Sequence, residues 1–173
     1  MPDVFTKAKR SEVMSRIRSR GNKDTELALA RVLRANGITG WRRQRKLRVE
    51  RRKGSTSPRP SPQRGEGVRR RNSQQSTLNH QLTITPDFVF SKQRVTVFVD
   101  GCFWHGCPKH ATNPKNNRAF WRRKLASNKQ RDLLVTRALR RAGWRVLRVW
   151  EHELAKKNQA RLLHRIQNAL PSL

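Results

Sequence analysis

A polar segment in the middle of the chain limits what this sequence can fold into. From Glu50 to Gly67, eighteen successive residues include no aliphatic, aromatic or sulfur-containing side chain, and residues 69–77 are almost as polar. Such a segment cannot bury enough apolar surface to offset the entropy lost on ordering. We therefore expect residues 50–82, approximately, to form a disordered insert within one domain that spans residues 1–173.

The chain also carries a large excess of positive charge. It has 41 Lys and Arg against 11 Asp and Glu among 173 residues, a formal net charge of +30. This charge would repel itself unless a polyanion compensates it, so nucleic acid is the expected partner, and a purely DNA-binding or RNA-binding protein is one open alternative. No apolar run approaches the roughly 20 residues of a membrane span. The N-terminus also lacks the apolar core of a signal peptide, so we expect an intracellular, cytoplasmic protein with no membrane partner.

The spacing of apolar residues on both sides of the polar segment predicts a mixed α/β domain. Apolar positions with a helical period predict helices over residues 11–20, 24–36, 118–142 and 154–170. Runs of β-branched and aromatic residues predict a hairpin of strands over residues 84–90 and 94–100, and a third strand over residues 144–150.

Two carboxylates belong to the predicted hairpin. Asp87 follows Pro86 near the start of the first strand, and Asp100 ends the second. Carboxylates on neighbouring strands can converge on Mg²⁺, which prefers oxygen ligands and activates water at a phosphodiester. A Pro-Asp pair followed by a second acid outlines the restriction-endonuclease-like nuclease fold, although Pro-Asp is also common in ordinary turns.

The segment DGCFWHGCPKH holds two cysteines and two histidines, side chains that commonly bind metals. Cys102, Cys107 and His110, with His152 after the third strand, supply the two thiolates and two imidazoles of a structural Zn²⁺ site. Buried free cysteines are the alternative. His105 is then left over as a general acid or base that a carboxylate on the following helix, Asp132, could orient, although lone histidines are often structural.

Five blocks of this sequence resemble the very-short-patch-repair (Vsr) family of DNA mismatch endonucleases, in the same order. The blocks are DVFTKAKRSEVMSRIRSRGNKDTELALARVL, PDFVF, VFVDGCFWHGCPKH, FWRRKLASNKQRD and AGWRVLRVWEHEL. The resemblance implies a restriction-endonuclease-like fold with a mixed sheet, a structural Zn²⁺, and Mg²⁺-dependent nicking of duplex DNA on the 5′ side of the thymine in a T:G mismatch. It also implies a monomer that acts on DNA and works beside other mismatch-repair proteins.

The resemblance assigns roles to individual residues. Asp87 would be the main Mg²⁺ ligand, and Glu26 on the second predicted helix would act through water. His105 matches the catalytic histidine, and Asp132 matches its carboxylate partner.

The resemblance also assigns a set of residues that wedge into DNA beside the mismatch. Phe103, Trp104 and Trp121 match the family's aromatic wedge, and Met14 would enter from the opposite groove. Ordinary core packing is the alternative for these side chains.

The sequence departs from the family pattern at four places. Asp100 stands where well-known members have histidine, so it could add a carboxylate to the catalytic metal. His152 replaces a cysteine ligand, and His110 lies one position from the family's third ligand. The insert before Asp87 is either a harmless extension or a mark of lost activity. The two rival functions are therefore a non-catalytic, zinc-stabilised DNA-binding relative and a nuclease that cuts matched DNA.

Overall fold

A computed structural model describes residues 12, 24–50, 81–112, 114 and 117–170 of the chain. The predicted helix over residues 11–20 and the residue Met14 lie outside this part, apart from Glu12. Residues 51–80, most of the predicted insert, also lie outside it. Within the described residues, no helix is long and apolar enough to cross a membrane.

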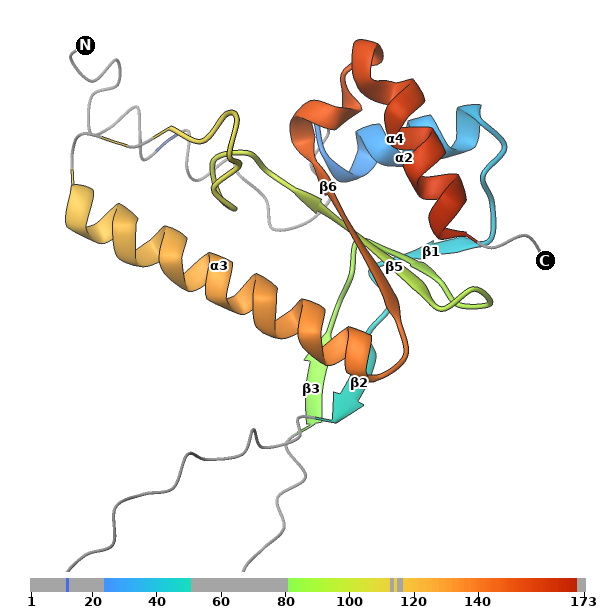
Figure 1. The fold of residues 1–173 in the computed structure, drawn as a ribbon, viewed down its shortest axis with the longest axis horizontal. Helices are drawn as coiled ribbons and strands as arrows, with labels where there is room; N and C mark the ends of the chain where they lie inside the picture. Colours follow the sequence, from blue (N-terminus) through green and yellow to red (C-terminus); the bar gives the residue numbers. More distant parts are fainter. Residues whose placement is uncertain (1–11, 13–23, 51–80, 113, 115–116, 171–173) are drawn as a thin grey trace, which may run out of the picture.

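A mixed sheet of four strands forms the centre of the described structure (Figure 1). Its order is β1-β4-β5-β6, in which β4 (Phe88–Phe90) runs antiparallel to both β1 (Trp41–Arg43) and β5 (Val95–Asp100). The last strand, β6 (Arg145–Trp150), is parallel to β5, with Asp100 opposite Trp150. The predicted α/β class, the β4–β5 hairpin and the third strand are therefore confirmed.

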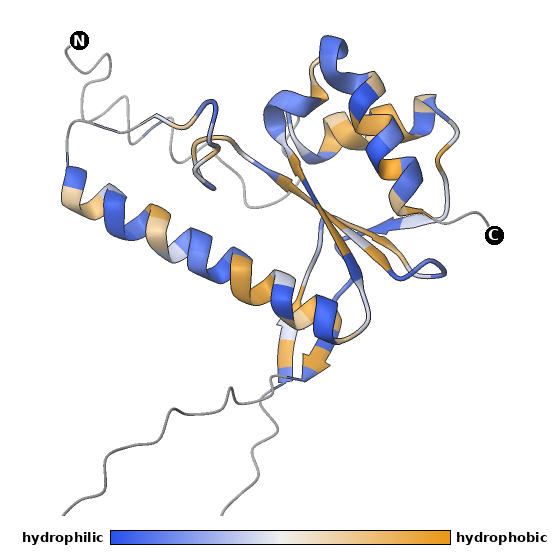
Figure 2. Cartoon of the chain, in the orientation of Figure 1, coloured by the Kyte–Doolittle hydropathy of each residue, from blue (hydrophilic) through white to orange (hydrophobic). Residues whose placement is uncertain are grey.

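Helices α2 (Glu26–Ala35) and α4 (Lys156–Ala169) cover one face of the sheet (Figures 1 and 2). Strand side chains alternate between faces, so Phe88 and Phe90 pack against these helices while Val89 points to the other side. A short 3-10 helix, η1 (Glu151–Leu154), joins β6 to α4. Helix α4 therefore begins two residues later than the predicted helix over residues 154–170, because Glu151–Leu154 forms this separate turn.

The opposite face of the sheet carries helix α3 (Arg118–Arg141) and a second, two-stranded sheet. Strand β2 (Leu47–Glu50) pairs antiparallel with β3 (Gln81–Ile84), and their apolar side chains form a cluster with the end of α3. The insert expected over about residues 50–82 overlaps this pairing at both of its ends, because Glu50 pairs with Gln81. The continuous strand expected over residues 84–90 is wrong, because β3 ends at Ile84 and β4 begins at Phe88.

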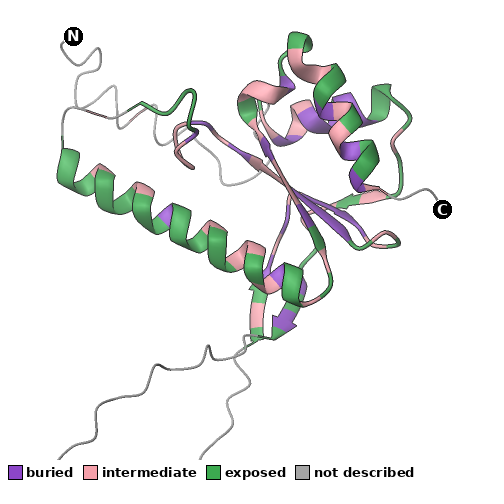
Figure 3. Ribbon diagram, viewed as in Figure 1, coloured by how far each residue is buried: buried purple, intermediate pink, exposed green. Residues whose placement is uncertain are grey.

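Helix α3 is exposed along most of its length (Figure 3). Of its 24 residues, only Asn128 and Leu139 are buried. Leu139 packs with the second apolar cluster, whereas Asn128 donates a hydrogen bond to the carbonyl oxygen of Trp104 at 2.9 Å. Polar contacts therefore contribute to holding the middle of this helix beside the sheet.

Candidate active site and metal centre

The predicted catalytic residues meet in one cleft of about 790 Å³. The cleft lies at the end of β5, between the start of α2, the end of β3 and the middle of α3. Its lining includes the five predicted side chains Glu26, Asp87, Asp100, His105 and Asp132. Residues separated by more than 100 positions in sequence are thus brought to one place.

Asp87 lies in the cleft immediately before β4. The backbone N–H of Val99 donates a hydrogen bond to its Oδ2 atom at 2.7 Å. Burial, together with the charges of Glu26 and Asp100, raises the pKa of the Asp87 carboxyl to about 6, against the lowering effects of the Val99 hydrogen bond and the Arg148 charge. A carboxylate in this environment gains by binding either a proton or a cation.

Glu26 is buried at the first turn of α2 and is held by two side chains from the end of β1. Its Oε2 atom accepts hydrogen bonds from Arg43 Nη2 at 2.7 Å and from Gln44 Nε2 at 3.0 Å. The backbone N–H of Gln44 also bonds the Asp87 carbonyl oxygen at 3.2 Å. Strand β1, which apolar patterning did not predict, therefore ties Glu26 to Asp87.

His105 and Asp132 form the predicted pair. The distance from His105 Nδ1 to Asp132 Oδ2 is 2.6 Å. Burial opposes ionisation of Asp132, but the hydrogen bond from His105 and the charges of His105 and Arg148 bring its pKa below the ordinary value. A carboxylate can only accept, so Nδ1 carries the proton and Nε2 is the free nitrogen.

Asp100 is buried and is paired with a residue that the sequence analysis missed. Arg148 donates to both of its oxygens, from Nε at 2.6 Å and from Nη2 at 2.5 Å. The proposed part of Asp100 in binding a catalytic metal stays a prediction, but both oxygens are already engaged. A charged residue inside the apolar strand WRVLRVW was the available signal, because such a residue needs a partner.

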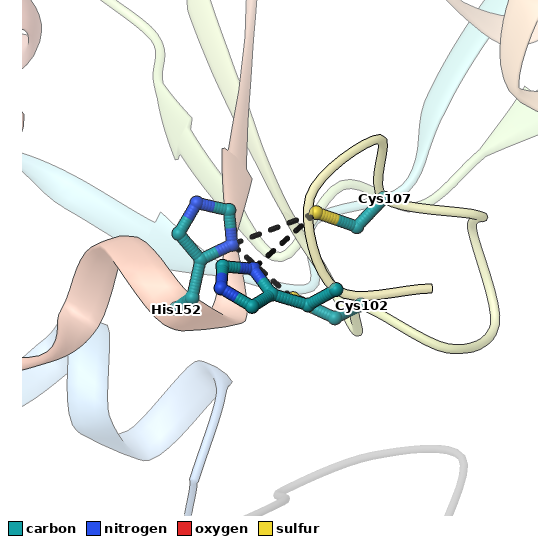
Figure 4. Close-up of side chains that lie close together, drawn as sticks. Cys102, Cys107 and His152 are labelled. Atoms are coloured by element: carbon teal, nitrogen blue, oxygen red, sulfur yellow. Dashed lines mark hydrogen bonds between the residues drawn. The ribbon is translucent and has the colours of Figure 1, made fainter. Parts of the chain in front are cut away.

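The four predicted zinc ligands gather in one place, where the loop after β5 meets η1. The ligand atoms of Cys102, Cys107, His110 and His152 all lie within 4.8 Å of one another, and among the described residues this is the one such group of His, Cys, Asp and Glu. We call it the Cys2His2 cluster. In Figure 4, His152 Nδ1 points to both sulfur atoms, at 3.3 Å from Cys102 and 3.7 Å from Cys107.

These separations fit a tetrahedral metal. Bonds of about 2.3 Å to sulfur and about 2.0 Å to nitrogen place neighbouring ligands at about 3.3 to 3.8 Å. Burial raises the pKa of the Cys102 thiol, and burial together with the charge of His110 lowers the pKa of His152, so this imidazole favours the neutral form that binds metals. The Cys2His2 cluster could therefore hold a metal such as Zn²⁺.

The predicted aromatic wedge residues are also adjacent. Phe103 contacts Trp104 and Trp121 edge to face, with ring centroids 5.1 and 5.2 Å apart, and Phe120 contacts Trp121 at 5.3 Å. We call these four residues the aromatic cluster. None of them belongs to either apolar core cluster, and Phe120 is 52% exposed. These side chains therefore lie outside the two core clusters, and their role as a wedge in DNA stays a prediction.

Comparison with known proteins identifies a family. The family model described as DNA mismatch endonuclease Vsr matches residues 2–51 and 64–111, a range that includes Glu26, Asp87, His105 and both cysteines. Asp132, Arg148 and His152 lie beyond the matched range.

Several curated proteins are similar to part of this chain. The type II nicking enzyme V.NaeI of Lentzea aerocolonigenes is 51% identical over 76 residues, which cover 44% of this chain and 46% of that protein. The DNA mismatch endonuclease Vsr of Escherichia coli strain K12 is 40% identical over 67 residues, or 38% of this chain and 43% of that protein. The type II nicking enzyme V.HpaIIP of Haemophilus parainfluenzae is 34% identical over 88 residues, or 50% and 62%. The chain thus spans about half the length of the curated relatives it matches.

Proposed function

The chain belongs to the Vsr family of DNA mismatch endonucleases, whose model matches more than half of its residues, and we propose that it nicks one strand of duplex DNA. The substrate we propose is a duplex with a T:G mismatch, cut on the 5′ side of the thymine, as the first step of repair. The restriction-endonuclease-like fold is part of the same proposal, which the mixed sheet supports.

One observation carries this proposal. A single cleft joins a desolvated carboxylate, Asp87, to an imidazole–carboxylate pair, His105 and Asp132, and Trp104 of the aromatic cluster also lines it. The cleft therefore combines groups suited to phosphodiester hydrolysis with aromatic side chains suited to contact with bases.

Asp87 is the residue of the cleft best suited to hold Mg²⁺. Its donor atoms are oxygens, its carboxyl is desolvated, and the nearby charges of Glu26 and Asp100 raise its pKa, so a cation would relieve an unfavourable concentration of negative charge. Bound there, Mg²⁺ would polarise the phosphoryl group and lower the pKa of water.

The protein's own groups position and move the proton. Asp132 fixes His105 through Nδ1, so Nε2 can accept a proton from the attacking water or donate one to the leaving oxygen. Arg43 and Gln44 fix Glu26, which lines the same cleft as Asp87.

The charge of α3 supports a duplex substrate. Nine of its 24 residues are Lys or Arg, and Asp132 is its one acid, which already bonds His105. Contacts from such a helix to phosphates supply affinity without sequence information. Preference for the mismatch must then come from elsewhere, and we assign it to the aromatic cluster, because a mismatched pair costs less to unstack than a matched pair.

We propose that Zn²⁺ in the Cys2His2 cluster is structural. The cluster joins the loop after β5 to η1 at the end of β6, and Glu151 accepts the Cys102 N–H at 3.2 Å. A metal there would hold the loop that carries His105 and the aromatic cluster against the sheet.

The test is cleavage of labelled duplexes that differ in one base pair. Wild-type protein with Mg²⁺ should nick a T:G duplex 5′ to the thymine much faster than the matched T:A duplex, and Asp87→Asn should nick neither. Equal nicking of both duplexes would favour the nuclease that cuts matched DNA. Binding without nicking by wild type, across varied base contexts, would favour the DNA-binding relative and overturn the proposal.

A further inference from the structure

Arg148 lies at the centre of the charged network in the cleft. Besides its two bonds to Asp100, its Nη2 atom lies 3.0 Å from Asp132 Oδ1. Asp132 uses its other oxygen to bond His105, whose Nδ1 is also 3.6 Å from Asp100 Oδ1. One guanidinium thus joins both carboxylates that face the histidine.

The residues around Arg148 fix the orientation of its side chain. Its guanidinium lies 5.2 Å from the centre of the Phe98 ring on the neighbouring strand β5. Phe98 is also its partner in the parallel register, so the two side chains leave the sheet side by side. The Phe98 ring, the strand register and the carboxylates of Asp100 and Asp132 together leave the planar guanidinium of Arg148 little conformational freedom.

Arg148 determines what Asp100 can do. A buried carboxylate without a partner would be costly and would be drawn to a cation in the cleft. Both oxygens of Asp100 instead accept hydrogen bonds from Arg148. The Asp100–Arg148 pair therefore leaves Asp87 available to a metal, and Asp100 acts as the counter-ion of Arg148.

Arg148 also holds α3 against the sheet near His105. Asn128, Asp132, Val135 and Leu139 recur at spacings of four, three and four residues, which places them on one face of the helix. Only Asn128 and Leu139 of this helix are buried, and the apolar contact lies near its C-terminal end. The bond from Arg148 to Asp132 connects the middle of the helix to the sheet.

We propose that Arg148 is a positioning residue for the nicking reaction: it holds Asp132, and through it His105, while neutralising Asp100. This inference rests on the proposed function for its kinetic consequence, but its structural consequence is measurable without activity. The side chain of Arg148 contacts Asp100, Asp132 and Phe98, so removing it should change the rate of the chemical step more than DNA binding.

The main variant is Arg148→Lys. Lysine keeps the positive charge but lacks the guanidinium group that bonds Asp100 and Asp132 at the same time. The matched control for this variant is Arg145→Lys on the same strand. Arg145 donates to the Ala169 carbonyl oxygen at 2.7 Å and lies at the opposite end of β6 from Trp150. A second variant, Asp100→Asn with Arg148→Met, removes the buried charge of Asp100 and the half-buried charge of Arg148 together, so neither is left unpaired.

Two readouts are needed. Single-turnover nicking of the T:G duplex at saturating protein should fall about 10- to 100-fold for Arg148→Lys, the usual cost of a misplaced catalytic group, with little change in Kd for DNA. NMR of the ring nitrogens should show loss of the hydrogen-bonded Nδ1 proton of His105, while the signals of His110 and His152 stay in place. Arg145→Lys should alter neither readout.

Unchanged His105 signals and an unchanged rate in Arg148→Lys would overturn the proposal, and so would a lower rate with unchanged His105 signals. If Arg148→Lys does not fold, the double variant decides: a folded protein with wild-type rate and His105 signals would show that the ion pair is only structural. If wild type nicks no duplex, the proposed function fails, and the NMR comparison still tests the positioning of His105.

Discussion

Replacing Asp87 with Asn should abolish nicking and stabilise the Mg²⁺-free protein above neutral pH. The Asp87 carboxyl is desolvated in the cleft, and this burial, with the charges of Glu26 and Asp100, raises its pKa from 3.8 to about 6. An asparagine of the same shape can still accept the Val99 N–H through its amide oxygen. The variant thus removes a costly charge and keeps the hydrogen bond.

The sign of the pH dependence follows from the raised pKa. The folded protein binds the Asp87 proton more tightly than the unfolded chain does, so the stability of wild type falls as pH rises from about 4 through about 6. The full pKa change corresponds to about 3 kcal/mol at about 1.36 kcal/mol per pKa unit. Because the side chain faces an open cleft, we expect about 1–2 kcal/mol, or about 3–6 °C in Tm for a chain of this length.

The assay is thermal unfolding of zinc-loaded protein without Mg²⁺ between about pH 5.5 and 8. The stability advantage of Asp87→Asn should grow up to about pH 7 and then stay constant. Asp24→Asn, at an exposed carboxylate on the rim of the same cleft, should change stability by less than about 0.5 kcal/mol. Added Mg²⁺ should stabilise wild type and not Asp87→Asn. A variant that is no more stable than wild type at pH 8 would refute the assignment of Asp87 as a desolvated carboxylate.

The Cys2His2 cluster, the central segment and the aromatic cluster give one further test each. Cys102→Ser should reduce zinc from one ion per chain to near none and abolish cooperative unfolding, whereas zinc-free wild type with a normal Tm would contradict a structural metal. Replacing residues 51–80 with Asn-Gly should preserve the fold and nicking, because Glu50 and Gln81 already pair as the ends of a hairpin, and loss of the thermal transition would show that the segment is structural. Trp121→Ala should lower the T:G over T:A cleavage ratio by about tenfold with little change in affinity for matched DNA, and an unchanged ratio would assign this residue to packing alone.

The sequence alone determined the elements whose side chains repeat with a clear period. The helix over residues 118–142, the hairpin of β4 and β5, and strand β6 were all predicted within one or two residues, apart from the early start assigned to the first hairpin strand. The four members of the Cys2His2 cluster were also predicted, because thiols and imidazoles at short spacing have few other common uses. In each case the signal lies in neighbouring residues, where local geometry determines the outcome.

Short strands held by distant partners were not predictable. Strand β1 has three residues, two of them Arg, and it exists because β4 pairs with it. Strand β3 begins within a segment whose polarity predicted disorder, and it exists because Leu47 and Val49 supply the opposite strand and the apolar face. Pairing of this kind depends on contacts between residues far apart in sequence, and no local period records them.

Tertiary structure also decided the charge state and partners of the candidate active site. The sequence named Asp87 as the main Mg²⁺ ligand and Asp100 as a further candidate, and both side chains line the cleft. Only the fold shows that Asp100 is paired with Arg148. The parallel register of β5 and β6 brings Arg148 beside Asp100, and the packing of α3 brings Asp132 to His105. The pKa of a carboxyl depends on burial and on charges within a few ångströms, so these properties exist only once the chain is folded.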